Sequence, residues 1–516
     1  MNPIERIKAE KLGLELLNEF PRLAAMQASE LSEDDKQRIK WIGFWYRKDG
    51  TLMQRIRIPG GTASSEQLRV IAGIAKEFGH DLVDVTTRAQ IQLRYIEMSQ
   101  IPEIFERLRA VGLSSIQTGM DSIRNVVTSS IAGICAREIF DALPVVREVS
   151  DWVTNGLEGN PATANLPRKM NFHITGHPDD VGAATNDIGM YPARKLDHDG
   201  TQQLGFNVMV GGAVGGKFPK LASEIDVFVT IPQVLEVTRG IVELFNLHGP
   251  REERHKSRLK WLIELWGFEK FRRELEAHLG HALERAGEDL RTPGDPHSPL
   301  GIHAQKQPGL VYVAAHVAVG RTTGTALEQL ADLADQFGNG EARFTIEQNI
   351  LLPNIEESRV DELLEHPFFL AHSPFPSKVA EGVVSCTGIE FCPFALIETK
   401  SRALEVTHAL EAQLEALPLA KPLRIHWSGC QHACSSHHIG DFGLQGTKVK
   451  VDGQMVDAVD VYIGGKIGRN ARLADKIADR IPISELPAKL IELTREHLPS
   501  HLSTNLSQQV LAAADD

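Results

Sequence analysis

The chain has 516 residues, of which 42% are hydrophobic and 24% are charged. This length exceeds what one hydrophobic core serves and predicts roughly three globular domains. The net charge of −13 argues against a nucleic-acid binder, which carries a basic surplus. No apolar run approaches the ~18 residues of a membrane helix, and the charged start lacks the apolar core of an export signal, so we expect a cytoplasmic protein without membrane contact.

The first elements are predicted from local patterns. Residues 1–45 are expected to form a helical segment. Residues 51–61 (TLMQRIRIPGG) alternate polar and apolar side chains up to Pro-Gly-Gly, which predicts a strand and a turn. Helical periodicity follows over 64–79, where Ser64 and Gln67 have capping-box spacing and Gly79 is a plausible stop. Residues 81–97 are typical of one or two strands that change direction at Arg88.

The same pattern recurs near the middle of the chain. A shift of 259 residues places 64–93 over 323–352 without a gap, and the identical residues fall mainly on the apolar face of the helix and at matching strand positions. Looser likeness joins 125–134 to 383–392 and 204–216 to 458–468. The chain is therefore interpreted as two diverged halves, each a strand–helix–strand module followed by a larger α+β module. Residues 285–309 are rich in Pro and Gly and predict a linker between the halves.

Four of the five cysteines form a cluster in the sequence. Cys135 stands alone and is expected to be a buried small hydrophobe. The others form C-x5-C and C-x3-C pairs, at Cys386 and Cys392 and at Cys430 and Cys434. Disulfides are not expected in a reducing cytosol. Four thiolates from two loops suit a cubane iron–sulfur cluster, which needs one sulfur per iron corner, and Gly388 and Gly429 would let the backbone approach it.

Histidines around the second pair keep other chemistry open. His426, His432, His437 and His438 surround Cys430 and Cys434. A mixed Cys/His zinc site stays an alternative, although the five-residue spacing of the first pair fits it poorly and adjacent His437 and His438 would point apart in regular structure. A catalytic Cys–His pair would leave three thiols unexplained.

Five motifs together carry a resemblance: CTGIEFC, GCQHAC, RIRIPGG, TTRAQIQL and LPRKMN. From about residue 5 to 495 the chain resembles the sirohaem-dependent nitrite and sulfite reductase family. The resemblance implies an α+β, internally duplicated fold in which two ferredoxin-like half modules join pseudo-symmetrically, with two larger α+β modules around a central sirohaem. The implied divisions are 1–45 (helical), 46–115 (first half module), 116–284 (sirohaem and substrate), 285–309 (linker), 310–372 (second half module), 373–500 (iron–sulfur and sirohaem) and 501–516 (tail).

The resemblance also implies the cofactors. Cys386, Cys392, Cys430 and Cys434 would hold a 4Fe–4S cluster as its metal ligands, and Cys434 would also bind the sirohaem iron. One departure concerns Gln431 and His432, which stand where the family usually has Pro-Asn. Ligation is expected to survive this change, whereas the hydrogen bonding around the sulfurs is expected to differ, and the role of His432 stays open.

An anionic cofactor and an oxyanion substrate both require fixed cations. Arg55 and Arg57 have strand spacing and so share one face, as do Lys169 and Asn171. By resemblance, Arg55, Arg124, Lys169 and Asn171 form the catalytic anion site. The residues expected at the sirohaem are Arg57, Arg88, Gln92, Arg254, Arg258 and Cys434, with Arg254 and Arg258 placed four apart on one helix.

Asn171 decides the predicted substrate. Sulfite-reducing relatives carry a second Lys at this place and nitrite-reducing ones carry Asn, which agrees with the larger charge of sulfite. The predicted enzyme is therefore an oxidoreductase that reduces nitrite to ammonium with six electrons, as nitrate assimilation requires. Assimilatory sulfite reduction is the first alternative; a cobalamin-pathway oxygenase or a zinc-stabilised binding protein is the next.

The electron donor is expected to be a separate protein. The chain has no flavin or nicotinamide module, because GGAVGG at 211–216 is a lone weak glycine match. By resemblance the donor is ferredoxin. Ferredoxins are acidic, so a local basic patch near the cluster would have to overcome the net charge of −13. A monomer is expected.

Overall fold

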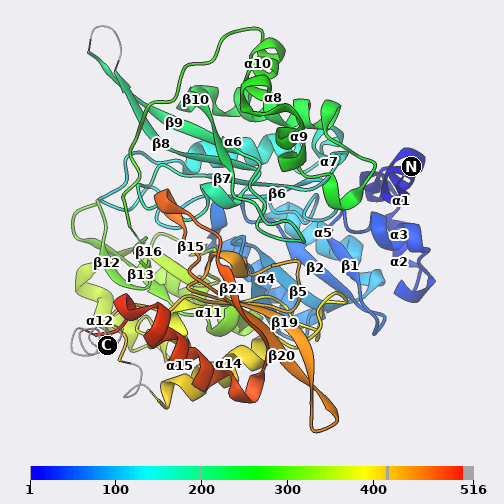
Figure 1. Cartoon of the computed structure of the whole chain (residues 1–516). Helices are drawn as coiled ribbons and strands as arrows, with labels where there is room; N and C mark the ends of the chain where they lie inside the picture. Colours follow the sequence, from blue (N-terminus) through cyan, green and yellow to red (C-terminus); the bar gives the residue numbers. More distant parts are fainter. Residues whose placement is uncertain (1, 197–199, 295, 414–417, 504–516) are drawn as a thin grey trace.

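The computed structural model describes residues 2–196, 200–294, 296–413 and 418–503 (Figure 1). The chain begins with three short helices, α1 (Pro3–Glu10), α2 (Phe20–Ala24) and α3 (Glu33–Arg38). The predicted tail over 501–516 lies outside the described residues from 504 onward. None of the helices in the described ranges is long and apolar enough to cross a membrane.

Two five-stranded sheets occupy the middle of the molecule (Figure 1), with the orders β1-β2-β5-β4-β14 and β12-β13-β16-β15-β3. Their strands are β1 (Phe44–Tyr46), β2 (Leu52–Ile56), β3 (Thr62–Ser64), β4 (Leu82–Val85), β5 (Ile91–Ile96), β12 (Gly301–Ala304), β13 (Leu310–Ala315), β14 (Arg321–Thr323), β15 (Glu341–Phe344) and β16 (Ile350–Glu356). The accompanying helices are α4 (Ser65–Phe78), α5 (Ile101–Ala110), α11 (Gly324–Phe337), α12 (Val360–Leu364) and α13 (Phe368–Ala371).

The predicted duplication is confirmed element by element. A shift of 259 residues carries α4 onto α11 and β4 onto β15 at both ends, and β5 onto β16 at its start. The predicted capping box at the start of α4 is present, and Gly79 is its C-cap. Even the left-handed backbone positions repeat, since φ is 61° at Tyr95 and 62° at Asn354. The two halves therefore share a backbone path that sequence identity alone shows only weakly.

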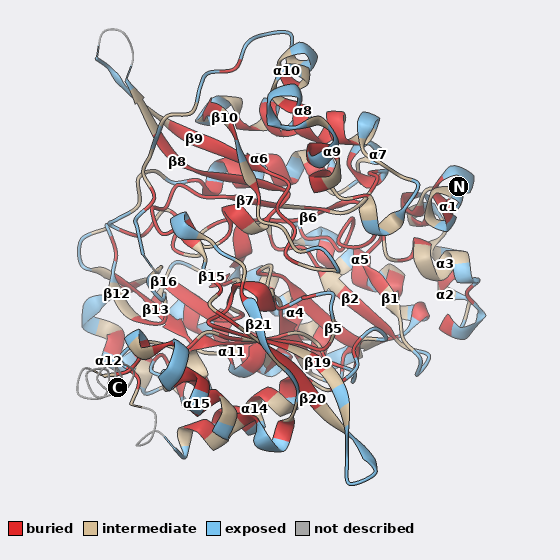
Figure 2. Ribbon diagram, viewed as in Figure 1, coloured by how far each residue is buried: buried red, intermediate tan, exposed pale blue. Residues whose placement is uncertain are grey.

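The halves exchange one short strand each. Strand β14 of the second half pairs with β4 of the first, and β3 of the first half pairs with β15 of the second. Helices α4 and α11 pack against each other, and one continuous core runs from Leu14 through both sheets to Phe369. In Figure 2 most of the ribbon in the central part of the molecule is coloured as buried. Neither half thus completes its own sheet without the other.

Two larger sheets lie on either side of this centre, and they share one topology. Their orders are β6-β7-β8-β9-β10 and β17-β18-β19-β20-β21, each with two parallel pairings followed by two antiparallel ones. The strands are β6 (Ile123–Val127), β7 (Met170–Ile174), β8 (Ile188–Leu196), β9 (Gln202–Val210), β10 (Ser223–Thr230), β17 (Val383–Ser385), β18 (Ile425–Ser428), β19 (Phe442–Val451), β20 (Gln454–Ile463) and β21 (Asp475–Pro482).

Helices complete these two layers. The first sheet is accompanied by α6 (Leu143–Thr154), α7 (Pro161–Ala164), α8 (Val234–His248), α9 (Leu259–Trp266) and α10 (Phe268–Leu279), and the second by α14 (Lys400–Glu411) and α15 (Leu486–His497). Each sheet has its own core. In Figure 1 the first layer lies at the top and α14 and α15 at the bottom. The α+β, duplicated architecture is confirmed.

The segment predicted as a linker contains regular structure. Within 285–309, β11 (Glu288–Asp289) pairs with β8, and β12 is a full member of the second small sheet. Both strands are short and bounded by Pro and Gly, so their composition resembles that of a loop. Strand β11 pairs with the distant strand β8, and β12 pairs with β13, the next strand in the chain, so pairing rather than local periodicity makes them strands.

Candidate active site

The four clustered cysteines lie on two loops at one edge of the second large sheet. Strands β17 and β18 are adjacent and parallel, with Ser385 paired to Trp427. Cys386 follows β17 directly, and Cys430 comes two residues after β18 ends at Ser428. Because neighbouring parallel strands end at the same sheet edge, the fold brings the two cysteine pairs together.

Backbone hydrogen bonds hold these loops against each other. Cys386 N–H donates to Trp427 O at 2.9 Å, and Cys392 N–H donates to Gly388 O at 2.9 Å. Gly429 N–H donates to Cys386 Sγ at 3.2 Å. An amide that donates to sulfur stabilises the thiolate form, which is typical of iron–sulfur ligands.

The two glycines of the loops have a packing reason. Gly388 has a left-handed φ of 75°, and a Cβ there would meet Glu398 Oε2 at 2.6 Å. A Cβ on Gly429 would meet Ala395 Cβ at 2.9 Å. Glycine at 388 is thus required by a contact within the first loop, and glycine at 429 by a contact between the two loops. The expected approach of these glycines to a cluster stays a prediction.

The four thiols act on one another. Burial raises the pKa of each, to about 11 at Cys430, and neighbouring thiols shift it in the same direction. At Cys430 the neighbours responsible are Cys434, Cys392 and Cys386, so all four sulfurs lie within electrostatic reach. Thiols with a raised pKa stay protonated at neutral pH unless a metal binds them.

The arrangement of these thiols suits a polynuclear group. The described ranges contain no group of three or more His, Cys, Asp or Glu side chains that could hold a metal ion. A cubane binds each sulfur at a different iron corner and so needs four thiolates. Four mutually interacting thiols on two loops, one of them with an amide donor, fit this requirement.

The histidines serve different purposes. His432 Nδ1 lies 3.4 Å from Cys430 Sγ, and its ring lies 5.2 Å from that of Phe394. His437 and His438 are buried, and their ring centroids are 4.1 Å apart. The expectation that these two rings point apart is wrong, because they form a 3₁₀ turn that starts from a left-handed residue, Ser436. Burial lowers the pKa of His437 to about 2, which keeps it neutral.

The side chains of Arg55 and Arg57 both donate to backbone carbonyls of residues 117–124, as expected for two residues on one face of a strand. Arg55 Nη1 donates to Thr118 O at 3.0 Å, and its guanidinium lies 4.4 Å over the ring of Trp45. Arg57 donates to three backbone carbonyls of residues 117–124 at 2.8 to 3.0 Å. The guanidinium of Arg57 therefore holds this segment in place through these three hydrogen bonds.

Arg88 and Arg124 are also held by neutral oxygens. Arg88 donates to Asn186 Oδ1 at 2.9 Å, and Arg124 donates to Met120 O at 2.9 Å. Within the described part of the chain, neither they nor Arg55 pair with a carboxylate. Burial lowers the pKa of Arg55 to about 10 and of Arg88 to about 9, so both stay charged at neutral pH. Buried cations without carboxylates create a site for an anion.

Lys169 adds a further cation beside the thiols. Its ammonium has no hydrogen-bond acceptor in the described ranges, and burial, followed by Arg258 and Arg124, lowers its pKa well below the ordinary value. Its charge also opposes the rise that burial causes in the pKa of Cys434. Asn171 N–H donates to Asp187 Oδ2 at 2.8 Å. Lys169 is thus placed between the cations and the cluster loops.

Arg254 and Arg258 do not share a helix, which corrects that prediction. Arg254 lies in a 3₁₀ turn and Arg258 is the extended N-cap of α9. Each is fixed by a bidentate pair: Arg254 with Asp121 at 2.8 and 2.9 Å, and Arg258 with Asp187 at 3.0 and 2.6 Å. These distant carboxylates, rather than local periodicity, determine the conformation of the segment.

Gln92 and Thr87 make further hydrogen bonds beside the site, and the one from Thr87 links the two halves. Gln92 Oε1 accepts a hydrogen bond from Arg94 Nη2 at 2.7 Å, so its amide oxygen is already occupied. Thr87 Oγ1 donates to Cys434 O at 2.9 Å, which ties the turn carrying Arg88 to the second cysteine loop. Sequence reasoning missed Thr87, which lies within the motif TTRAQIQL, and Arg94, which directly follows that motif.

The glycine-rich stretch 211–216 has a structural role. Gly216 N–H donates to Gln431 O at 2.9 Å, and a Cβ on Gly215 would meet His432 O at 2.4 Å. The stretch packs against the second cysteine loop, and these close approaches explain its glycines. It lies beside the candidate site without forming a nucleotide-binding turn.

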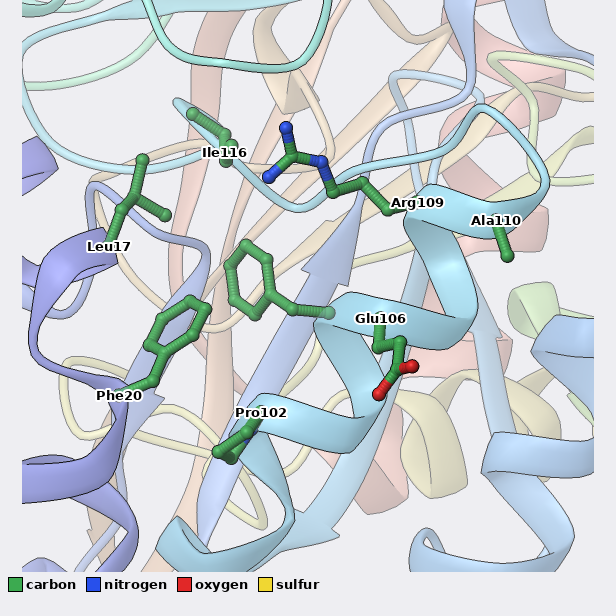
Figure 3. A pocket seen from close by; sticks show the side chains of 8 residues that line it. Leu17, Phe20, Pro102, Glu106, Arg109, Ala110 and Ile116 are labelled. Carbon is green, nitrogen blue, oxygen red and sulfur yellow. The ribbon is translucent and has the colours of Figure 1, made fainter.

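A groove elsewhere on the molecule is distinct from this site. Figure 3 shows it between the N-terminal helices and α5, with a volume of about 560 Å³. Its lining is mainly apolar and consists of Leu17, Phe20, Pro102, Phe105, Glu106, Arg109, Ala110 and Ile116. None of the predicted site residues belongs to it.

Comparisons with known proteins match both kinds of module in the chain. Residues 119–283 and 380–499 match the nitrite and sulphite reductase 4Fe-4S domain, and residues 46–111 and 303–367 match the nitrite/sulfite reductase ferredoxin-like half domain. The ferredoxin–nitrite reductase of Leptolyngbya laminosa is 42% identical, and that of Synechococcus elongatus is 40% identical. The alignments cover 96% of this chain and 97% and 96% of those relatives. The solved structure of the Mycobacterium tuberculosis NirA protein matches with a TM-score of 0.89 and 28% identity over 98% of this chain and 96% of that one.

Proposed function

The chain belongs to the nitrite and sulphite reductase family, and we propose that it is an oxidoreductase that reduces nitrite to ammonium with six electrons. One observation carries the proposal. Four mutually interacting thiols lie on two loops beside buried cations that have no carboxylate partner among the described residues. Such a site fits a metal cluster next to an anion, and the named relatives act on nitrite.

The residues present fit the two groups that the family implies. The 4Fe–4S cluster would be held by Cys386, Cys392, Cys430 and Cys434. The positive charge of Lys169 acts on the pKa of Cys434, and this thiol would also face the sirohaem. Sirohaem has a rim of carboxylates, which would supply the negative charge that Arg88 and its neighbours without a carboxylate partner lack, whereas Arg258 is already paired with Asp187. When bound, these groups supply one-electron transfers and an iron for the substrate.

The chain's own residues bind and orient the oxyanion. Arg55, Arg124 and Lys169 would place positive charge around the nitrite oxygens and favour the charge that develops as N–O bonds break. The guanidinium groups of the two arginines are already fixed by Thr118 O and Met120 O, so little reorganisation is needed. Burial, followed by the neighbouring arginines, lowers the pKa of Lys169 well below the ordinary lysine value, so its ammonium gives up a proton more readily than an ordinary lysine does.

Nitrite is favoured over sulfite by one residue. Asn171 is half-buried, and its side-chain amide has no partner among the described residues, so it is free to bond an oxyanion. A Lys at this place would add a second ammonium beside Lys169, which helps a dianion more than a monoanion. Both relatives named above are nitrite reductases.

The proposed electron donor is a separate protein, ferredoxin. The names of the relatives and the surface at the cysteine loops support this proposal. Ile389, Phe394 and Leu396 are large apolar side chains of the first loop, and they are 51%, 63% and 49% exposed. Exposed apolar side chains around a redox centre are suited to a transient partner. The first loop carries no Lys or Arg from 386 to 399, so it does not supply the expected basic patch.

The cytoplasmic location, the monomeric state and the domain boundaries stay predictions.

The test compares two substrates and one substitution. Anaerobically purified wild-type protein and the Asn171→Lys variant are assayed with nitrite and with sulfite, using a reduced ferredoxin. We expect kcat/KM of the wild type to favour nitrite and the variant to shift toward sulfite. Asn171→Asp serves as the matched control, because it keeps the size and should weaken binding of both anions. A wild type that prefers sulfite would contradict the proposal, as would a purified protein that contains zinc but neither sirohaem absorption nor iron.

A further inference from the structure

Four charged residues form a buried network behind the first cysteine loop, which we call the Asp84 network. It comprises Asp84, Arg94, Arg321 and Lys400. Arg94 Nη2 lies 2.6 Å from Asp84 Oδ2, Arg321 Nε lies 3.1 Å from Asp84 Oδ1, and Lys400 Nζ lies 3.5 Å from the same oxygen. Three cations thus surround one carboxylate, and the side chains of Asp84, Arg94 and Lys400 are at most 3% exposed.

The network contacts the loop between Cys386 and Cys392 directly. Arg94 Nη2 donates to Thr387 Oγ1 at 3.0 Å, and Arg321 Nη1 donates to Glu390 Oε2 at 2.9 Å. The ring of Phe391, next to Cys392, is faced by both guanidinium groups at 4.7 and 5.3 Å. Arg47 adds a third, 4.4 Å from the same ring. A phenyl face favours cations, so this ring gathers positive charge beside a cluster ligand.

The duplication shows that the fold itself does not require this network. Under the shift of 259 residues, the pair Asp84–Arg321 corresponds to Arg343–Thr62 in the other small sheet. The counterpart of Arg94 is Pro353. Lys400 begins α14, and the helix in the matching layer begins with Leu143. The charged set therefore exists only on the side of the cysteine loops.

We propose that the Asp84 network raises the reduction potential of the cluster by holding excess positive charge behind the loop from Cys386 to Cys392. The inference rests on the proposed function, which supplies the cluster. Each reduction takes one electron from the external donor and adds one negative charge to the cluster and its four thiolates. Fixed positive charge nearby stabilises the reduced form, because net charge and surroundings determine iron–sulfur potentials. In this role Arg94 and Arg321 are positioning residues that act through charge.

The experiment measures the midpoint potential of the cluster in the holoenzyme by a redox titration followed by electron paramagnetic resonance. Arg321→Gln removes one positive charge and should move the potential to a more negative value. We expect the ratio of reduced to oxidised cluster to fall about tenfold at a fixed donor potential, which corresponds to a shift of about 59 mV for one electron. Arg321→Lys keeps the charge and should restore most of the potential.

Two further variants separate charge from structure. Glu390→Gln removes the exposed negative charge that faces Arg321 and should shift the potential in the opposite direction. Arg359→Gln is the matched control, since Arg359 also lies over a phenyl ring, at 4.3 Å from Phe337, and also pairs with a glutamate. It lies outside the network and should leave the potential unchanged.

The outcomes distinguish this inference from the proposed function. Opposite shifts in Arg321→Gln and Glu390→Gln, with none in Arg359→Gln, would support the network's role. Unshifted potentials in a cluster-bearing, nitrite-reducing protein would overturn the inference alone. A wild type without any iron–sulfur signal would overturn both.

Discussion

At the residue scale, the candidate site depends on cations whose usual partners are missing. Arg55, Arg88 and Arg124 donate to neutral oxygens, and Lys169 has no acceptor within the described ranges. Taking charges out of water is costly unless an opposite charge compensates. The site is therefore most stable when occupied by anions, which links binding of the cofactor and the substrate to the same set of side chains.

The protonation state of Lys169 should make the binding of nitrite depend on pH. Burial and the neighbouring arginines lower its pKa, so its ammonium loses its proton at a lower pH than an ordinary lysine. A bound anion favours the protonated form, and KM for nitrite should rise as pH rises through this pKa. In Lys169→Gln, we expect KM to be about tenfold to hundredfold higher and its pH slope to flatten, since a charged hydrogen bond contributes about 1.5–3 kcal/mol.

The measurement is kcat and KM for nitrite across pH in three proteins. Lys169→Arg is the matched control, because it keeps the charge and should show a KM that changes little with pH. If Lys169→Gln keeps the wild-type slope of KM against pH, another group is responsible and Lys169 does not bind the anion.

At the scale of elements, several starts and stops follow from the sequence and others do not. The capping box of Ser64 and Gln67 and the strand-turn of 51–61 are local, and the structure confirms them. Arg254 and Arg258 misled the prediction because their conformation depends on Asp121 and Asp187, which are far away in the chain. Local patterns cannot show such partners.

The capped helix starts offer a simple test. Ser64 Oγ accepts from Gln67 N–H at 3.2 Å, and the equivalent Thr323 Oγ1 accepts from Ala326 N–H at 3.0 Å. Replacing either residue with Ala should cost about 1 kcal/mol, because an amide of the first turn loses its acceptor. We expect faster amide hydrogen exchange in the first turn of α4 for Ser64→Ala and of α11 for Thr323→Ala. Exchange that speeds up equally in both helices for one substitution would contradict a local cap.

At the scale of the whole molecule, the exchange of β3 and β14 makes the two halves one folding unit. The repeat itself is visible in the sequence, since its shift of 259 residues predicts α11 from α4. The exchange is not visible, because each strand has only three residues and pairs with a partner from the other half. The Asp84 network escaped prediction for the same reason: β14 places Arg321 beside Asp84 across the two halves.

The shared core predicts joint unfolding. Leu327 on α11 is fully buried in the core that spans both small sheets. Leu327→Ala should destabilise the protein by about 2–5 kcal/mol through the cavity that it leaves. Because the halves share this core, the circular dichroism signal and the cofactor absorbance of Leu327→Ala should be lost in one transition. The midpoint of that transition should lie at a lower denaturant concentration than in the wild type.

The control for this prediction is Leu265→Ala, since Leu265 is 72% exposed and its removal should change the midpoint little. Two separated transitions in Leu327→Ala, with one half unfolding first, would show that the halves are independent and that the strand exchange does not join them.

The most direct test of the proposed activity is the stoichiometry of the reaction. Anaerobic protein is supplied with limiting nitrite and reduced ferredoxin, and the oxidised ferredoxin, the remaining nitrite and the ammonium formed are measured together. We predict six electrons consumed and one ammonium formed for each nitrite lost, since the nitrogen keeps no oxygen. Consumption of one electron per nitrite without ammonium, or no turnover by protein that holds both cofactors, would contradict the account.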